Sequence, residues 1–164
     1  MIKLGHLTEY EISICKLFSN TCYLTNMEEY TKRKQPNIDK VKLDIFNGKQ
    51  AEILVYKYLI SKRKEVSPPD FMIYTKFNKS FDADIKVINN SIHVKSCQNS
   101  SMFPNSWLFE PSDTLITHPL ETDFLALVVL GDVNYMYLTS AKGIVYNKPI
   151  KNLNKKVIYE KDLL

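Results

Sequence analysis

The sequence predicts an α/β domain, bordering on α+β, in which helices flank a mixed central sheet. Three observations lead to this class. Residues 39–63 carry apolar side chains at helical spacing, residues 84–97 alternate apolar and polar side chains about a short turn, and residues 123–131 form a continuous apolar run. Such a run is typical of a strand buried on both faces of a sheet. The chain has 164 residues, 45% of them hydrophobic, and we expect a single domain over residues 1–164.

Two helices are expected in the first third of the chain. Residues 6–35 have roughly helical apolar spacing and end at Pro36, so residues 1–36 are interpreted as a helical N-terminal extension. The next helix, residues 39–63, can be capped by Asn37 or Asp39. Glu52 interrupts its apolar stripe. A carboxylate in that position must be exposed at a groove, paired, or bound to a cation, because burying it bare is costly.

The remaining elements are mainly strands. Strands are predicted at residues 71–77, 84–88 and 91–97, followed by a loop-rich stretch, the buried strand 123–131, its hairpin partner 133–141 and an edge strand near residues 155–160. Trp107 and Phe109 in the loop-rich stretch are interpreted either as core anchors or as stacking partners for a base.

The hairpin at residues 84–97 sorts its side chains into two faces. Taking Asn89-Asn90 as the turn pairs Asp84 with Lys95 across the strands. One face is then wholly apolar and the other carries Asp84, Lys86, His93 and Lys95. A solvated cross-strand ion pair would account for this polar face. Taken alone, the hairpin favours that interpretation. A functional cluster is the alternative, and the carboxylate of Glu52 within an apolar stripe makes the cluster the favoured interpretation.

Composition narrows the class of protein. No apolar run approaches the roughly 20 residues that span a bilayer, and the N-terminus has no signal peptide pattern, so a cytoplasmic protein without membrane association is expected. Three cysteines without a CxxC pair argue against a disulfide framework and a thiolate zinc site. The net charge of +4 permits a polyanionic partner.

The motifs resemble those of the PD-(D/E)xK nuclease superfamily, which has the restriction-endonuclease-like fold. The resemblance lies in Glu52 within "GKQAEILVYKYL", Asp84 within "FDADIKV", and His93 and Lys95 within "IHVKS". It covers residues 39–131, which would form the catalytic core. It implies a helix, a three-stranded meander, a crossover and a further strand. It also implies a divalent-metal-dependent endonuclease that cleaves DNA to 5′-phosphate products with Mg²⁺ or Mn²⁺.

The resemblance also implies residue roles. Asp84 would be the central metal ligand and Glu52 a further ligand, the Val94 carbonyl would complete the shell, and Lys95 would position or activate the attacking water. The DNA backbone would meet three residues that follow the motif, namely Gln98, Asn99 and Ser100. His93 departs from the family, which usually has Glu, Asp or Gln there. It would ligate the metal in place of that residue, which is the favoured interpretation, move a proton or contact phosphate, or mark an inactive site.

Several alternatives stay open at this point. Asp70, in the literal Pro69-Asp70, ranks below Asp84 as the central ligand, whereas Asp82 becomes its rival if the hairpin contains a bulge. Basic residues 32–34 and 62–64 would contact phosphates or simply be solvated. DNA is the expected partner, and a homodimer would help to supply specificity. The competing function is a catalytically inactive nuclease-fold module that binds nucleic acid or protein. An unrelated α+β domain is the third possibility. The resemblance is compatible with a role in restriction, in DNA repair, in phage DNA degradation or in the transposition of mobile elements.

Overall fold

The computed structural model of the chain describes residues 1–32, 37–75, 83–100, 102–149 and 153–164. Its helices are α1 (Glu9–Thr25), α2 (Met27–Lys32), α3 (Ile38–Ser61), α4 (Thr114–Thr117) and the 3-10 helix η1 (Glu160–Leu163). Its strands are β1 (Ile2–Lys3), β2 (Ile85–Val87), β3 (Asn90–Gln98), β4 (Ser106–Phe109), β5 (Asp123–Leu130), β6 (Tyr135–Ser140) and β7 (Lys156–Tyr159).

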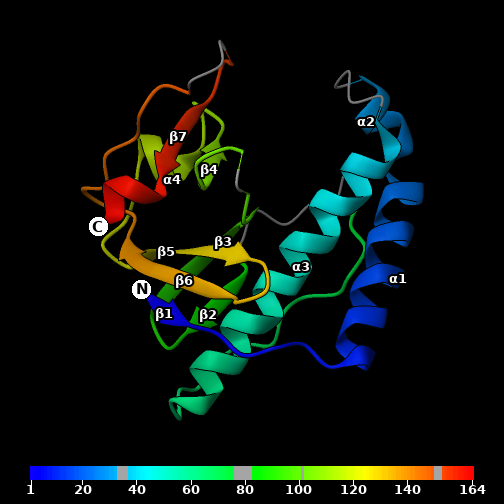
Figure 1. Ribbon diagram of the computed structural model, residues 1–164, viewed down its shortest axis with the longest axis horizontal. Helices are drawn as coiled ribbons and strands as arrows, with labels where there is room; N and C mark the ends of the chain where they lie inside the picture. The colour runs from blue at the N-terminus through cyan, green and yellow to red at the C-terminus, as the bar shows by residue number, and fades with distance from the viewer. Residues whose placement is uncertain (33–36, 76–82, 101, 150–152) are drawn as a thin grey trace.

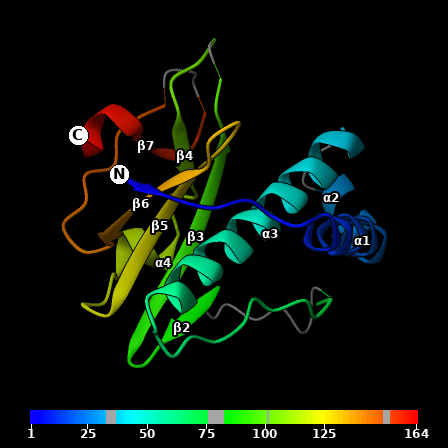
Figure 2. The ribbon, with the colours of Figure 1, turned by 60° about the horizontal axis from the view of Figure 1, so that its bottom comes forward.

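Five of these strands form a mixed sheet in the order β1-β6-β5-β3-β2. β3 and β5 run parallel, whereas the other three neighbouring pairs are antiparallel. Figures 1 and 2 show α3 lying across one face of this sheet, with α1 on the far side of α3. The small sheet of β4 and β7 packs with α4 against the opposite face. The predicted class, a mixed sheet flanked by helices, is confirmed.

Helix α3 forms where the sequence predicts it. Of the two candidate caps, Asn37 is the one used, because its side chain accepts the Lys40 N–H at 2.9 Å. Leu54 and Val55 of α3 pack into a cluster with Ile85 of β2, and each fully buried side chain of this kind contributes about 1.5–3 kcal/mol. This packing fixes which side of α3 faces the sheet.

The N-terminal segment differs from the predicted single helix over residues 6–35. A capping box between Thr8 and Glu11 begins α1. Asn26 then ends it, since the Asn26 backbone N–H bonds back to α1 and its side-chain Nδ2 donates to the Tyr74 carbonyl at 3.0 Å. Residues 33–35 lie outside the described residues. The first 36 residues also contain β1, which pairs with β6, so this segment is not purely a helical extension.

The hairpin of β2 and β3 keeps the predicted apolar face, which packs with α3, but it has a different register. Ile85 pairs with Ile92 and Val87 with Asn90, so the turn is formed by Ile88 and Asn89, with φ of +54° at Ile88. The predicted pairing of Asp84 with Lys95 is therefore wrong by two residues. Strand side chains alternate with a period of two, so such a shift leaves the apolar face unchanged and the pattern cannot distinguish the two registers.

The predicted strand at residues 71–77 is wrong in its described part, because residues 71–75 form no strand. The aromatic ring of Phe71 packs edge-on against Phe18 of α1, with centroids 5.4 Å apart. This segment is thus held against the helices, and Figure 2 shows the described chain that follows α3, up to residue 75, running out toward α1. Of the three-stranded meander that the resemblance implies, the described residues form only β2 and β3.

The opposite face of the sheet is covered by aromatic side chains. Trp107 and Phe109 of β4 are each 1% exposed, and Trp107 donates to the Val128 carbonyl at 3.1 Å. Both are therefore core anchors, and their interpretation as stacking partners for a base is wrong. The predicted edge strand near residues 155–160 is β7, which is largely buried and pairs with β4 rather than with the main sheet.

Two further expectations concern the cysteines and the membrane. All three cysteines are free thiols, and burial raises the pKa of Cys97 to about 12. Across the described ranges, no helix is both long enough and apolar enough to cross a bilayer.

Candidate functional site

Helix α3 carries Glu52 as half of a buried ion pair. The Lys49 Nζ lies 2.6 Å from Glu52 Oε2, and the two side chains are only 9% and 13% exposed. Residues three apart on a helix are neighbours, which explains why this pair forms locally. Of the three options that the sequence leaves open for Glu52, the structure thus has the paired one.

Lys49 is enclosed by more than Glu52. Its Nζ also donates to the Asp70 carbonyl at 2.7 Å, and it lies 4.7 Å and 5.2 Å from the ring centroids of Phe18 and Phe71. A cation between two aromatic faces is favourable, particularly where water is excluded. Lys49 therefore joins α1, α3 and the segment before β2 at one buried point.

Burial raises the pKa of Glu52 to about 7, and this effect outweighs the lowering by the Lys49 ammonium. The charges of Asp84 and then Asp70 raise the pKa of Glu52 further. The Asp70 backbone carbonyl lies beside the pair, because it accepts the Lys49 Nζ. The charges of Asp84 and Asp70 thus act on Glu52 electrostatically, and the contact of Glu52 itself is with Lys49.

Asp84 lies where β2 and β3 separate. Its Oδ2 accepts the Val94 backbone N–H at 2.7 Å. The ladder between the two strands ends at the pair of Ile85 and Ile92, so a carboxylate takes the place of a strand partner at Val94. Because the N–H and C=O of a strand residue leave the same side of the strand, the Val94 carbonyl emerges on the edge that Asp84 occupies.

His93 and Lys95 lie on the other face of β3. Val94 packs toward α3, and its two neighbours in sequence therefore point away from α3. The His93 Nε2 is 3.8 Å from Asp123 Oδ1 at the start of β5, and the Lys95 Nζ is 5.4 Å from the ring centroid of Phe109. Glu52, by contrast, belongs to the helix on the opposite side. The four predicted catalytic side chains are thus divided between two faces.

The rival carboxylates have distinct environments. The Asp70 carboxylate accepts hydrogen bonds from the Tyr74 hydroxyl and the Met72 N–H, and the first of these is the main cause of its lowered pKa. Asp82 lies outside the described residues. Within the described ranges, no three His, Cys, Asp or Glu side chains gather closely enough to hold a metal ion.

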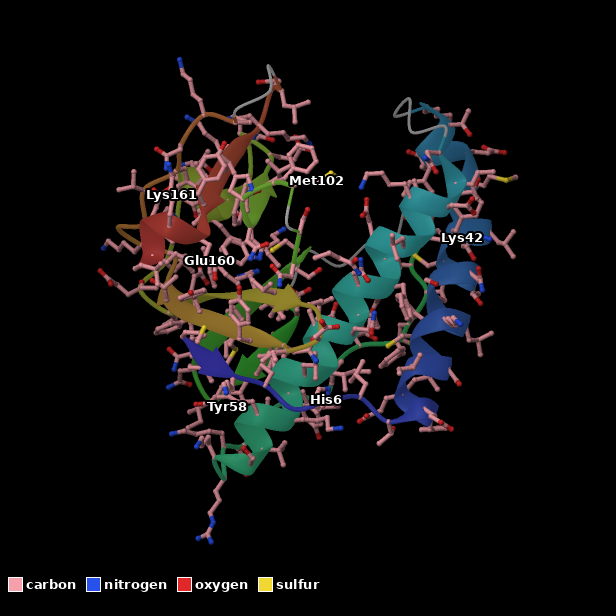
Figure 3. The ribbon with its side chains drawn as sticks, viewed as in Figure 1. His6, Lys42, Tyr58, Met102, Glu160 and Lys161 are labelled. Atoms are coloured by element: carbon pink, nitrogen blue, oxygen red, sulfur yellow. The ribbon has the colours of Figure 1, made fainter. Side chains whose placement is uncertain are left out.

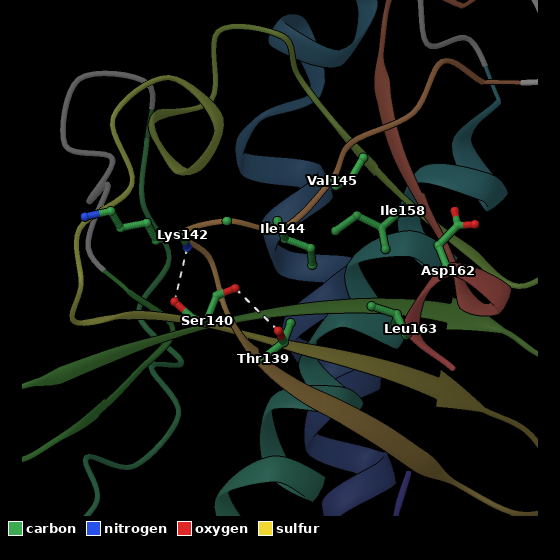
Figure 4. Close-up of a pocket in the computed structure, with 9 residues that line it drawn as sticks. Thr139, Ser140, Lys142, Ile144, Val145, Ile158, Asp162 and Leu163 are labelled. Carbon is green, nitrogen blue, oxygen red and sulfur yellow. Dashed lines mark hydrogen bonds between the residues drawn. The ribbon is translucent and has the colours of Figure 1, made fainter.

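The predicted nucleic-acid contacts lie at the end of β3. Gln98, Asn99 and Ser100 are all exposed. The Gln98 Nε2 donates to Asn47 Oδ1 at 3.3 Å, whereas Asn99 Oδ1 accepts from Asn105 at 3.3 Å. Gln98 and Asn99 both line a pocket between α3 and the carboxyl ends of β3 and β5. Another pocket, of about 380 Å³, lies beside β6 and η1 and contains none of the predicted site residues (Figure 4).

Sequence reasoning missed Lys49 and Asp123. Lys49 stands three residues before Glu52 on a predicted helix, and that spacing alone suggests an ion pair. Asp123 stands at the head of the buried apolar run. Its neighbour His93 could be found only from the parallel pairing of β3 with β5, which local sequence patterns do not specify.

No known protein-family model, curated protein or solved structure matches this chain.

Proposed function

We propose that the chain is a divalent-metal-dependent endonuclease of the PD-(D/E)xK type that hydrolyses DNA phosphodiester bonds. The observation that carries this proposal is the placement of Asp84 against the Val94 backbone, with Glu52 close enough for the charge of Asp84 to raise its pKa. Carboxylate and carbonyl oxygens are the donors that Mg²⁺ prefers, and Mn²⁺ accepts them as well.

The residues take the following roles in the proposal. Asp84, Glu52 and the Val94 carbonyl would hold Mg²⁺ or Mn²⁺, and the metal would supply an activated water and charge stabilisation at the phosphate oxygens. Glu52 would have to leave its ion pair with Lys49 to serve as a ligand. Lys95 neutralises charge that develops on the phosphate. His93, whose Nε2 lies 3.8 Å from Asp123 Oδ1, would serve as a proton-transfer group in this proposal rather than as the metal ligand that the resemblance favours.

Cleavage of supercoiled plasmid tests the proposal. With Mg²⁺ or Mn²⁺ we expect nicked and linear products with 5′-phosphate ends. The variants Asp84→Asn and Lys95→Ala should each lower the rate by about 100-fold or more, since each removes a charge at the reacting phosphate. Asp44→Asn, an exposed position on α3, is the matched control and should cleave normally. Absence of cleavage by the unaltered chain with every divalent metal would refute the proposal.

A second candidate is a nuclease-fold module that binds nucleic acid or protein without cutting. Two observations favour it: the buried pair of Lys49 with Glu52, and the separation of His93 and Lys95 from Glu52 by the sheet. Fluorescence anisotropy with labelled DNA in EDTA distinguishes the two functions. Binding of DNA combined with no cleavage under any metal would support the module.

A further inference from the structure

A pocket of about 410 Å³ lies at the carboxyl ends of the parallel strands β3 and β5, between those ends and α3. The segment after β1 closes one side, where the His6 carbonyl accepts the Lys57 Nζ of α3 at 3.1 Å. Figure 3 shows His6 on the segment that crosses α3. Carboxyl ends of parallel strands are common places for ligands, because loops diverge there.

The lining of this pocket contains a single titratable side chain, that of His6. Asp, Glu, Lys and Arg make up 24% of the chain, yet none of them is among the 13 lining residues. A phosphate or a carboxylate would find no Lys or Arg of the lining as its counter-charge. The pocket therefore suits a neutral ligand.

Carboxamides and apolar side chains share the lining. The carboxamide residues are Asn47, Gln50, Gln98, Asn99 and Asn134. Apolar groups such as Phe46 and Leu54 supply the remaining surface. A side-chain amide offers donors and an acceptor in one plane, so this lining matches a flat ligand with apolar faces and a hydrogen-bonding edge.

Two of these amides are held only weakly by the protein. The Nε2 atoms of Gln50 and Gln98 both donate to Asn47 Oδ1, at 3.4 Å and 3.3 Å. These distances are near the upper limit for a hydrogen bond, so exchanging them for a ligand costs little. Among the described residues neither Gln50 Oε1 nor Gln98 Oε1 accepts a hydrogen bond, which leaves both as acceptors for a ligand.

We propose that this pocket binds an unstacked nucleobase, with adenine favoured. A nucleobase is flat, uncharged and apolar on its faces, and Asn and Gln amides pair with both edge groups of adenine, N6 and N7. Gln98 is three residues beyond Lys95 on β3, which places the pocket about 10 Å along the strand from that lysine. The inference that this pocket binds a base of a nucleic-acid strand rests on the proposed function. The inference that it binds a free nucleoside does not.

The first test is a titration of the chain in EDTA, followed by the side-chain amide signals of Asn and Gln in ¹⁵N NMR spectra. Adenosine should shift the amides of Asn47 and Gln98, whereas ribose should not. Gln98→Ala and Gln50→Ala should each weaken adenosine binding by about 10-fold, as expected for loss of one part of an amide pair. Asn20→Ala, on the exposed side of α1, is the matched control and should leave binding unchanged.

A second arm uses short oligonucleotides in EDTA, so that no cleavage can occur. Oligo-dA should bind more tightly than oligo-dT of the same length, and Gln98→Ala should remove the difference. Equal shifts from adenosine and ribose, or no shift with about 10 mM adenosine, would overturn the inference. Adenosine binding in a chain that never cleaves DNA would support the pocket and refute only the nuclease.

Discussion

The two faces of β3 are covered by different kinds of side chain. On the α3 face the packing side chains are mainly aliphatic, and the same helix also carries the buried ion pair of Lys49 and Glu52. On the other face, the aromatic anchors Trp107 and Phe109 cover the sheet beside His93 and Lys95. Alternation along the strand thus assigns a side chain to a face, whereas the element that covers the face decides which side chains surround it.

The aromatic face should show the largest loss of stability. Trp107→Ala removes a fully buried ring and its hydrogen bond to Val128, and we expect the free energy of unfolding to fall by about 3–5 kcal/mol at any pH between 5 and 8. Urea unfolding followed by circular dichroism measures it. A loss below about 1 kcal/mol would show that this face contributes little to the core.

On the α3 face, the free energy of unfolding should fall when the buried cation Lys49 is removed. Lys49→Met leaves the Glu52 carboxylate buried without a partner, and we expect a loss of about 3 kcal/mol at pH 8. The loss should be much smaller at pH 5, where Glu52 is protonated. Lys40→Met, which breaks an exposed pair with Asp44 on the same helix, is the control and should change stability little at either pH. Equal losses at both pH values would contradict the electrostatic explanation.

The pH dependence of stability should report Glu52 directly. The pKa of its carboxyl is raised from 4.5 to about 7, so the folded state binds the proton more tightly than the unfolded state. The resulting stabilisation is complete below pH 4.5 and is lost as the pH rises through 7. Relative to Glu52→Gln, the unaltered chain should lose about 2–3 kcal/mol of unfolding free energy across that window. Parallel stability curves for the two proteins would contradict a raised pKa.

A small effect is expected where the aromatic face meets η1. The Tyr137 hydroxyl donates to Glu160 Oε1 at 3.0 Å, and Figure 3 shows Glu160 between the small sheet and the main sheet. Tyr137→Phe should lower the unfolding free energy by about 1 kcal/mol, since only one hydrogen bond is removed. Tyr10→Phe, at an exposed position on α1, serves as the control. A loss of about 3 kcal/mol or more would contradict this expectation, because it exceeds the contribution of one hydrogen bond.

The sequence alone could predict those parts of the fold that depend on local periodicity. Helix α3, the apolar face of the hairpin and the doubly buried β5 all follow from spacing within one segment, whereas the choice of Asn37 over Asp39 as the cap does not. The predicted strand at residues 71–77 has the apolar and β-branched composition of a strand, yet its described part, residues 71–75, forms none. Phe71 instead packs against Phe18 of α1, a contact between distant segments.

The candidate site was predictable to a lesser degree, because its geometry depends on register and on partners from other elements. A two-residue shift of the hairpin moves Lys95 away from Asp84 without disturbing any local pattern. Lys49 could have been found from helical spacing, but its contact with the Asp70 carbonyl could not. The amide pocket joins four separate segments, and no short motif indicates it.

The turn at Ile88 has a consequence for how this hairpin could be improved. A β-branched side chain at φ of +54° is strained, and 76% of Ile88 is exposed, so it gains little from burial in return. Glycine meets no such penalty in this conformation. The register of the hairpin is therefore maintained by its core pairs and by the hydrogen bond to Asp84, whereas the conformation of the turn opposes it. Ile88→Gly would remove this strain and stabilise the edge of the candidate site from a position in the turn, outside both faces of the sheet.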